Sequence, residues 1–311
     1  MKSGFYIAGA ASLAAFLSAG PALAQTPPTG NIDERVRQQV SPPGEREQED
    51  ALMTGDSDLI LLRRTKLFNL HGSLDVNGTS NAYLAPTNAV ADGFAQLQAG
   101  IGMGTRVGGK VDLFADLSLS GVRYFEQGGL DYNALTGAIG AGVHLGKLRL
   151  SATYQPQLVF SRDFGTRQLT SHRFRLSASA PFTLKGVTIQ PEAHGERVIT
   201  RPRDYSAWSV GASLTASVPL SKKAPLFAYV SAGYDRREFD DYFTAFVGLD
   251  RKDSVLSASA GIVWRPRTWG EVRVNYSFGR DWSTSDVNGY TAHTGTLGVA
   301  AVLRFCPLCA G

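Results

Sequence analysis

Long segments in which apolar and polar residues alternate one by one constrain this chain more than any other feature. Trp208, Val210 and Ala212, for example, alternate with Ser209 and Gly211. Because successive side chains of a β-strand point to opposite faces, each such segment predicts a strand with one apolar and one polar face. We count twelve of these segments, at roughly 66–76, 93–104, 109–122, 133–146, 147–161, 169–181, 186–199, 205–219, 226–238, 254–265, 270–281 and 291–305. The sequence therefore predicts an all-β fold.

The lengths of the segments and of their connections indicate a membrane barrel. Most segments reach ten residues, and a strand tilted by about 45° needs roughly 9 to 11 residues to cross a bilayer. Short connections such as Gly146-Lys147 alternate with long ones such as residues 77–92. An even number of strands with short turns at one end and long loops at the other is typical of outer-membrane barrels. We predict a transmembrane antiparallel up-and-down β-barrel of about 12 strands, in the cell outer membrane, with both termini on the periplasmic side.

Aromatic residues and hydropathy agree with a spanning barrel. The mean hydropathy of -0.10 is too polar for a bundle of transmembrane helices. Aromatic side chains gather near both ends of the predicted strands, where two interfacial girdles are expected. Those near the short turns are Phe182, Phe227, Trp264, Trp269 and Phe305, and those near the long loops are Tyr124, Phe160, Tyr205, Tyr234, Trp282 and Tyr290.

Segments with other roles flank the predicted barrel. Residues 1–24 are predicted to be a signal peptide, because a basic start and an uncharged apolar run precede the cleavage pattern Ala22-Leu23-Ala24. Residues 25–65 are predicted to be an acidic, proline-containing periplasmic tail. The barrel is expected at 66–305, followed by a C-x-x-C tail at 306–311. Cys306 and Cys309 are candidates for a small terminal disulfide in an oxidising compartment.

The cleavage pattern, the twelve segments and the final strand ending in Leu303-Arg304-Phe305 resemble bacterial outer-membrane β-barrel, porin-like proteins. That resemblance implies insertion by the outer-membrane assembly machinery, which recognises a terminal aromatic residue. Here six more residues follow Phe305, so the signal is displaced. The last two segments also have a faint similarity to the barrel of surface lipoprotein assembly modifiers, carried by Ser283, Ser285, Asn288, Tyr290 and Phe305.

If the apolar faces contact lipid, the charged residues of the alternate faces line the lumen. The lumen-lining charges that we predict are Lys110, Arg149, Arg173, Arg175, Arg265, Arg273 and Arg304, opposed by Asp112, Asp116, Glu192, Glu196 and Glu271. A basic stripe with acidic residues on a facing wall would set a transverse field that can select anions. Arginine–carboxylate pairs could equally serve only to satisfy one another in a narrow barrel. Both interpretations stay open.

Residues typical of catalysis are few. His194 lies between Glu192 and Glu196, and His71 lies near Ser73 and Asp75 on the same predicted face. A hydrolase would need a serine nucleophile beside such a histidine, and no nucleophile motif accompanies either one. We predict no enzymatic activity, no cofactor and no metal site.

We predict a porin-like passive channel for small solutes, with a charged lumen that contains arginine. The alternative is a plugged structural or assembly barrel that acts on another envelope component, and contact between the inward Phe94, Phe114 and Phe227 would favour it. An outer-membrane hydrolase is a third hypothesis. The expected partners are outer-membrane lipid, the assembly machinery and lipopolysaccharide, whose phosphates Arg197, Arg201 and Arg203 could contact. Nucleic acid is not an expected partner.

Overall fold

The computed structural model of the protein describes residues 68–107, 110–221, 224–240, 251–267, 269–284 and 289–305. The predicted signal peptide, the whole of the predicted tail and both cysteines lie outside the described residues. No helix among the described residues is long and apolar enough to cross a membrane.

Long antiparallel strands make up nearly all of the described chain. They are β1 (Phe68–Thr79), β2 (Asp92–Val107), β3 (Val111–Tyr124), β4 (Tyr132–Leu145), β5 (Leu148–Ser161), β6 (Arg167–Ser179), β7 (Phe182–Leu184), β8 (Val187–Arg201), β9 (Ala207–Pro219), β10 (Leu226–Phe239), β11 (Lys252–Arg267), β12 (Gly270–Ser283) and β13 (Tyr290–Phe305).

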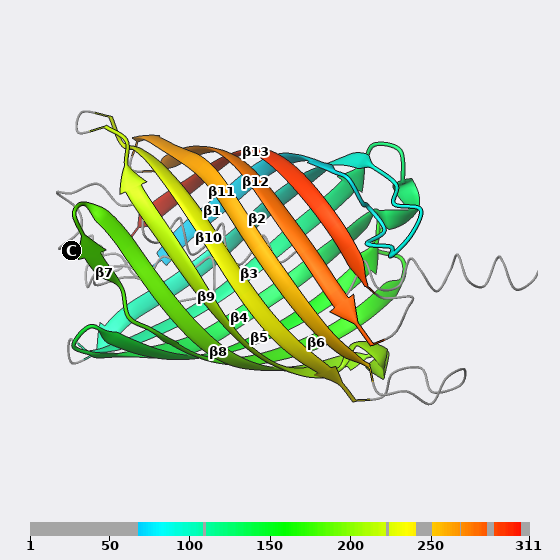
Figure 1. Cartoon of the computed structure of the whole chain (residues 1–311), viewed down its shortest axis with the longest axis horizontal. Helices are drawn as coiled ribbons and strands as arrows, with labels where there is room; N and C mark the ends of the chain where they lie inside the picture. The colour runs from blue at the N-terminus through cyan, green and yellow to red at the C-terminus, as the bar shows by residue number, and fades with distance from the viewer. Residues whose placement is uncertain are drawn as a thin grey trace, which may run out of the picture.

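These strands form one closed barrel (Figure 1). Each long strand pairs with the long strands before and after it in sequence, and β1 pairs with β13 from Phe68–Phe305 to Thr79–Thr294, which makes the closing seam. The short β7 continues the line of β6 beyond Pro181 and pairs only with the start of β8. The barrel wall is therefore twelve strands, as predicted, with one strand interrupted.

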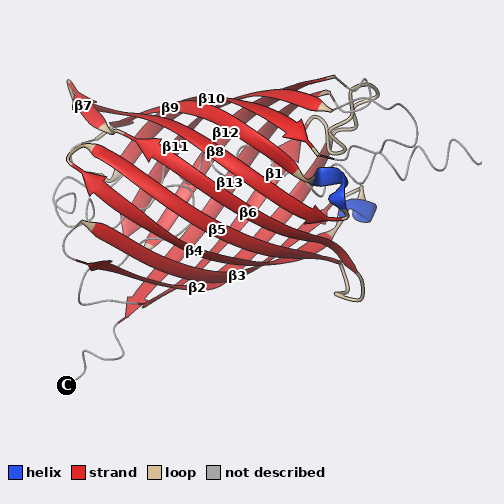
Figure 2. Cartoon of the chain, turned by 90° about the horizontal axis from the view of Figure 1, so that it is seen from below, coloured by secondary structure: helices blue, strands red, loops and turns tan. Residues whose placement is uncertain are grey.

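The connections alternate in length along the chain. Short turns, including Gly146-Lys147 and Lys185-Gly186, lie at one end, which we call the turn end. Longer connections lie at the other, the loop end, and two of them contain the short helices η1 (Gly128–Leu130) and η2 (Arg203–Tyr205). Figure 2 shows both helices at the opposite end of the barrel from β7.

The alternation sorts side chains to the two faces of the wall. Val210 and Leu214 of β9 are 63% and 52% exposed, whereas Thr215 and Ser217 are buried. Because the wall is a single sheet, a buried strand side chain faces the interior and an exposed one faces outward. The barrel is thus apolar outside and polar inside, as a membrane-spanning barrel must be.

The predicted aromatic girdles are only partly right. Phe182, Trp264 and Trp269 are exposed at the turn end, and Tyr234 and Trp282 are exposed at the loop end. Phe227 and Tyr290, however, are buried on the inward face, so neither can reach an interface. Phe227 packs there with Tyr229 and Val263. Proximity to a strand end does not decide which face a residue occupies, because that depends on whether its position is odd or even.

Candidate functional site

The inward face of the barrel carries charged side chains in groups that cross neighbouring strands. The turn-end group surrounds Asp112 of β3, which is fully buried. Its carboxylate accepts hydrogen bonds from Arg106 Nε of β2 at 2.5 Å and from Arg106 Nη2 at 3.0 Å. His144 Nε2 of β4 lies 2.6 Å from the same carboxylate, and Arg149 Nη2 of β5 lies 3.8 Å from it. The carboxylate of Asp112 therefore interacts with three basic side chains, which come from three different strands.

A mid-barrel group joins β6, β8 and β10. Arg175 Nη2 donates to Glu192 Oε1 at 2.9 Å, and its Nη1 lies 3.5 Å from Glu196 Oε2. Arg173 Nε lies 3.4 Å from Glu196 Oε1. His194 Nε2 lies 2.7 Å from Asp235 Oδ1 of β10. Charged groups of both signs therefore alternate along this part of the wall.

A third group lies beside the closing seam. Arg273 Nη2 of β12 donates to both carboxylate oxygens of Asp75 of β1 at 2.6 Å, across the intervening strand β13. Arg265 Nε lies 3.1 Å from Glu271 Oε2, and Arg273 Nη1 lies 4.0 Å from Glu271 Oε1. The seam therefore carries an ion pair between residues that are 198 positions apart in the sequence.

Polar groups without charge lie between these charged groups on strands β9 to β12. Short hydroxyl side chains face inward on four consecutive strands, and we call them the serine arc: Ser209, Thr215, Ser217, Ser231, Ser257, Ser259 and Ser277. Thr215 and Ser231 bond to each other through their hydroxyls at 2.9 Å. Side chains of this size extend only a short distance from the wall.

The sequence-predicted charges are placed as follows. Arg149, Arg173, Arg175, Arg265, Arg273, Asp112, Asp116, Glu192, Glu196 and Glu271 lie on inward faces with low or intermediate exposure. Lys110 does not, because it is exposed in the turn between β2 and β3 rather than within a strand. The side chain of Arg304 lies outside the described part. Asp116 lies apart from the turn-end group, with its Oδ2 3.7 Å from His71 Nδ1.

The acidic and basic side chains are arranged differently from our prediction. We expected them on facing walls, but the carboxylates lie beside the arginines on the next strand or the next but one. Inward residues of neighbouring antiparallel strands are about 5 Å apart, within reach of a long side chain, whereas the far wall is not. Local pairs therefore form instead of a field between two walls.

Several charged residues that form ion pairs were missed from the sequence. Arg106 was assigned to a turn, because the strand was expected to end at residue 104, whereas β2 runs to Val107. Arg251 and Asp253, which bond to each other at 2.5 Å, were assigned to a long loop. His144 and Asp235 lie at inward positions of predicted strands, so the alternation itself was the signal that could have found them.

Contact among the three inward phenylalanines would favour the plugged barrel, and a serine beside a paired histidine would favour the hydrolase. The Phe94 ring is tilted against the Tyr124 ring, Phe114 lies over Gly140, and Phe227 belongs to a cluster on β10 and β11, so the three have separate neighbours. His194 Nδ1 has no hydrogen-bond partner among the described residues, and its nearest charged neighbour is Glu192 at 3.9 Å. His194 and Asp235 therefore form a pair to which no described serine adds a nucleophile.

Comparison with known proteins supports the fold. No protein-family profile matches the chain, and no curated protein matches it in sequence. Among solved structures, an outer membrane channel from Pseudomonas putida F1 is similar with a TM-score of 0.50 and 12% identity, over 77% of this chain and 96% of that one. LpxR from Salmonella typhimurium has a TM-score of 0.44 and 14% identity, over 73% and 99%. An anion-selective porin from Comamonas acidovorans has a TM-score of 0.38 and 11% identity, over 76% and 99%.

The closed wall with its apolar outer face, together with the similarity to the Pseudomonas putida channel, leads to one conclusion about the fold. The chain is an outer-membrane β-barrel, and its apolar outer face places it in the bacterial outer membrane.

Proposed function

We propose that the protein is a passive channel for small hydrophilic solutes. The observation that carries this proposal is the serine arc, because seven short hydroxyl side chains line four neighbouring strands. Barrels of about eight strands are just filled by their side chains, and those of 16 to 18 strands leave an aqueous channel. A twelve-stranded barrel lies between these sizes. The short inward residues of these four strands, which also carry the inward Phe227, Tyr229 and Arg273, reach less far into the interior than large ones and support a water-filled path over a packed interior.

The charged groups would set the preference of such a channel among ions. Arg173 and Arg106 keep 26% and 20% of their side chains exposed, so both could meet a passing solute while they remain near a carboxylate. Each of these arginines has a carboxylate close by on the wall. The electric fields of the two opposite charges therefore partly cancel for a solute that is farther from the wall than the pair is wide. We therefore expect modest selectivity, governed by the exposed members of the groups.

The test is the single-channel conductance and ion selectivity of the refolded full-length protein in a planar bilayer. We expect steady openings. Arg173→Gln should shift the permeability ratio toward cations, because it leaves Glu196 with one guanidinium partner instead of two. Arg267→Gln is the matched control: it removes the same charge from an exposed side chain at the turn end, and should leave the ratio unchanged.

Silence from a folded, correctly inserted barrel would contradict the channel and return the plugged structural or assembly barrel as the better hypothesis. Steady openings with an unchanged ratio in Arg173→Gln would preserve the channel but remove the mid-barrel group from its selectivity.

A further inference from the structure

The connections at the loop end differ in charge. Counting each connection with the strand residue on either side, the one between β5 and β6 holds Arg162, Asp163 and Arg167, and the one between β8 and β9 holds Arg201, Arg203 and Asp204. Both thus have a net positive formal charge. The other four connections each contain more acidic than basic residues. Because β6 pairs with β8, the two positive connections are neighbours on the rim.

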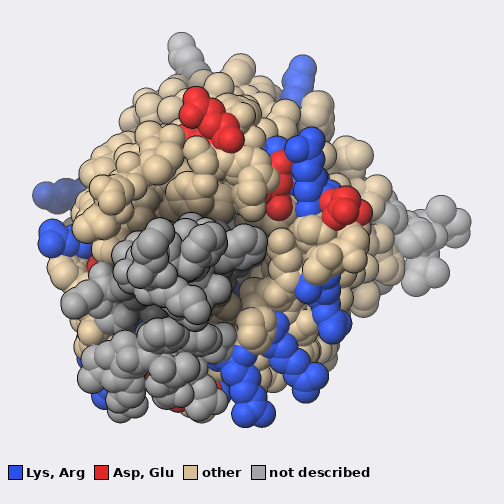
Figure 3. Space-filling view, turned by 90° about the vertical axis from the view of Figure 1, so that its right-hand side faces the viewer, with Lys and Arg blue, Asp and Glu red and all other residues tan. Residues whose placement is uncertain are grey.

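The four arginines of these connections, Arg162, Arg167, Arg201 and Arg203, are exposed, and we call them the basic rim. The side chain of Arg162 is 72% exposed. Figure 3 looks onto the loop end, and most of the basic side chains in view follow the lower and right part of its edge. The positive charge is therefore concentrated on one arc of the rim.

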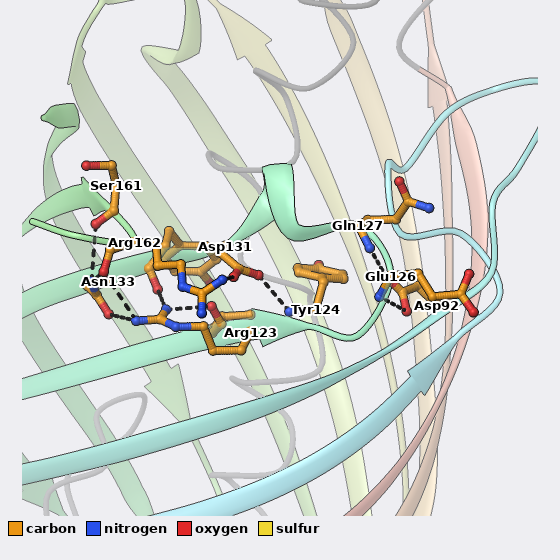
Figure 4. Close-up of polar contacts among 11 residues, drawn as sticks. Asp92, Arg123, Tyr124, Glu126, Gln127, Asp131, Asn133, Ser161 and Arg162 are labelled. Carbon is orange, nitrogen blue, oxygen red and sulfur yellow. Dashed lines mark hydrogen bonds and ion pairs between the residues drawn. The ribbon is translucent and has the colours of Figure 1, made fainter.

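A polar network fixes the connection that carries Arg162 (Figure 4). The Asn133 amide donates to the main-chain oxygens of Ser161 at 3.2 Å and Arg162 at 2.8 Å, and Arg123 donates to Asn133 Oδ1 at 2.7 Å. Asp131 lies 3.3 Å from Arg162 and accepts the N–H of Tyr124. The arginine therefore projects from a held backbone.

The acidic residue next to Arg162 is engaged within its own turn. Asp163 accepts hydrogen bonds from the Ser161 hydroxyl and the Gly165 N–H, which hold the pKa of this carboxyl below its usual value. The second connection is held in a similar way: the Thr200 N–H donates to Ser206 Oγ at 2.9 Å, and the Thr200 hydroxyl donates to the Pro202 carbonyl at 2.6 Å. The basic rim is thus presented by two ordered turns.

An exposed apolar surface lies directly next to the basic rim on the outer wall. Phe174 of β6, Ile199 of β8 and Trp208 of β9 are 47%, 43% and 60% exposed. Arg197 lies between Phe174 and Trp208 in the strand register, with its guanidinium 5.0 Å from the Trp208 ring centroid. Asp240 bonds to Arg197, so this arginine is already neutralised and packs as part of the apolar surface.

We propose that the basic rim and the apolar surface beside it bind the phosphorylated sugar headgroup of an outer-leaflet glycolipid. The guanidinium groups of Arg167, Arg201 and Arg203 would contact the phosphates, together with that of Arg162, which stays 72% exposed beside Asp131, since arginine binds phosphate oxygens through paired, charge-assisted hydrogen bonds. The acyl chains would lie along Phe174, Ile199 and Trp208. The longer loops of such barrels face the cell exterior, which sets this surface at the outer leaflet. An acidic soluble partner would match the charge but not the apolar surface that continues from it.

The test measures binding of bis-phosphorylated lipid A to the folded full-length protein in mixed detergent micelles, by native mass spectrometry. The same lipid without its phosphates and inorganic phosphate are run in parallel. Arg201→Gln/Arg203→Gln should weaken lipid A binding by at least about tenfold, because hydrogen bonds to charged groups are among the stronger ones. Lys147→Gln/Arg267→Gln removes the same charge from exposed positions at the turn end and should bind like the unaltered protein.

Heat-modifiable gel mobility would verify that all the variants are folded. Equal weakening in both double variants would overturn the proposal, because it would mean a general effect of net charge. Equal binding of the dephosphorylated lipid would also overturn it. Competition by inorganic phosphate at the same concentration as lipid A would point to a free-phosphate site instead of a lipid site. Arg162→Gln/Arg167→Gln provides a second variant, on the other connection, with the same expected loss.

Discussion

Inward glycines allow side chains two strands apart to meet across the strand between them. Gly298 of β13 lies in register between Asp75 and Arg273, and Gly211 of β9 lies between His194 and Asp235. A Cβ added at either glycine would collide with the acidic side chain that passes over it. Glycine is therefore required at these positions because of a close approach, and not because of its backbone angles.

Gly298→Ala is predicted to displace Asp75 and to leave Arg273 buried without its carboxylate. Breaking a buried ion pair by removing one partner typically costs about 3–5 kcal/mol, since the remaining charge stays in a place of low dielectric. The measurement is urea-induced unfolding in lipid vesicles. Gly295→Ala is the control, because this glycine is on the same strand and a Cβ there would meet nothing within 4 Å. Equal stability of the two variants would contradict the role of Gly298.

The same residues show where prediction from sequence ends. Alternation was enough to place Arg273 and Asp112 on the inward face. It could not pair Arg273 with Asp75, because that contact depends on how β1 and β13 are aligned when the barrel closes. Nor could it show that Asp112 serves Arg106, His144 and Arg149 together, since that requires the registers of three successive strand pairs.

Individual strands were the most predictable part of the molecule. The segment expected at 133–146 is β4, Tyr132–Leu145, and the one expected at 186–199 is β8, Val187–Arg201. A period of two sustained over ten residues leaves few alternatives to a strand with two different faces. The interruption between β6 and β7 was not predicted, although Pro181 marks it: proline has no N–H to donate to the neighbouring strand.

Leu214→Arg is predicted to destabilise the barrel by ~2–4 kcal/mol, if the residue lies near the membrane midplane, because it places a charge on the lipid-facing side. Leu214 is 52% exposed on the outer wall of β9. Leu220→Arg, just beyond the turn end of the same strand, is the matched control and should cost about 0–1 kcal/mol, because the penalty falls toward the interface. Unfolding in vesicles measures both, and a smaller loss for Leu214→Arg than for Leu220→Arg would mean that the faces or depths are assigned wrongly.

At the scale of the whole molecule, one closed sheet pairs each long strand among the described residues on both of its edges, and only the short β7 pairs on one edge alone. The seam between β1 and β13 is reinforced by polar side chains: the Thr296 hydroxyl donates to Asn77 Oδ1 at 2.7 Å, and Thr294 lies 3.4 Å from Thr79 between hydroxyl oxygens. Closure satisfies the hydrogen-bonding groups of both terminal strands, which lipid cannot do.

The folded protein is therefore predicted to migrate faster on a detergent gel when unheated than when boiled, because a closed barrel stays compact in detergent. Gly298→Ala should convert to the slow form at a lower temperature than the unaltered protein, since it weakens the seam. A gel over a series of temperatures measures both effects. Identical mobility of heated and unheated samples would argue against a closed barrel.

The ion pair across the seam also bears on how the barrel is completed. Asp75 belongs to the first strand and Arg273 to the penultimate one, so they can meet only after the last strand has docked against the first. Before that moment a guanidinium destined for burial lacks its carboxylate, and a slip of one residue at the seam would turn Asp75 toward lipid. The Asp75–Arg273 ion pair therefore forms only when the barrel is closed in its native register. An intermediate that is open or out of register lacks this pair and is less stable for that reason.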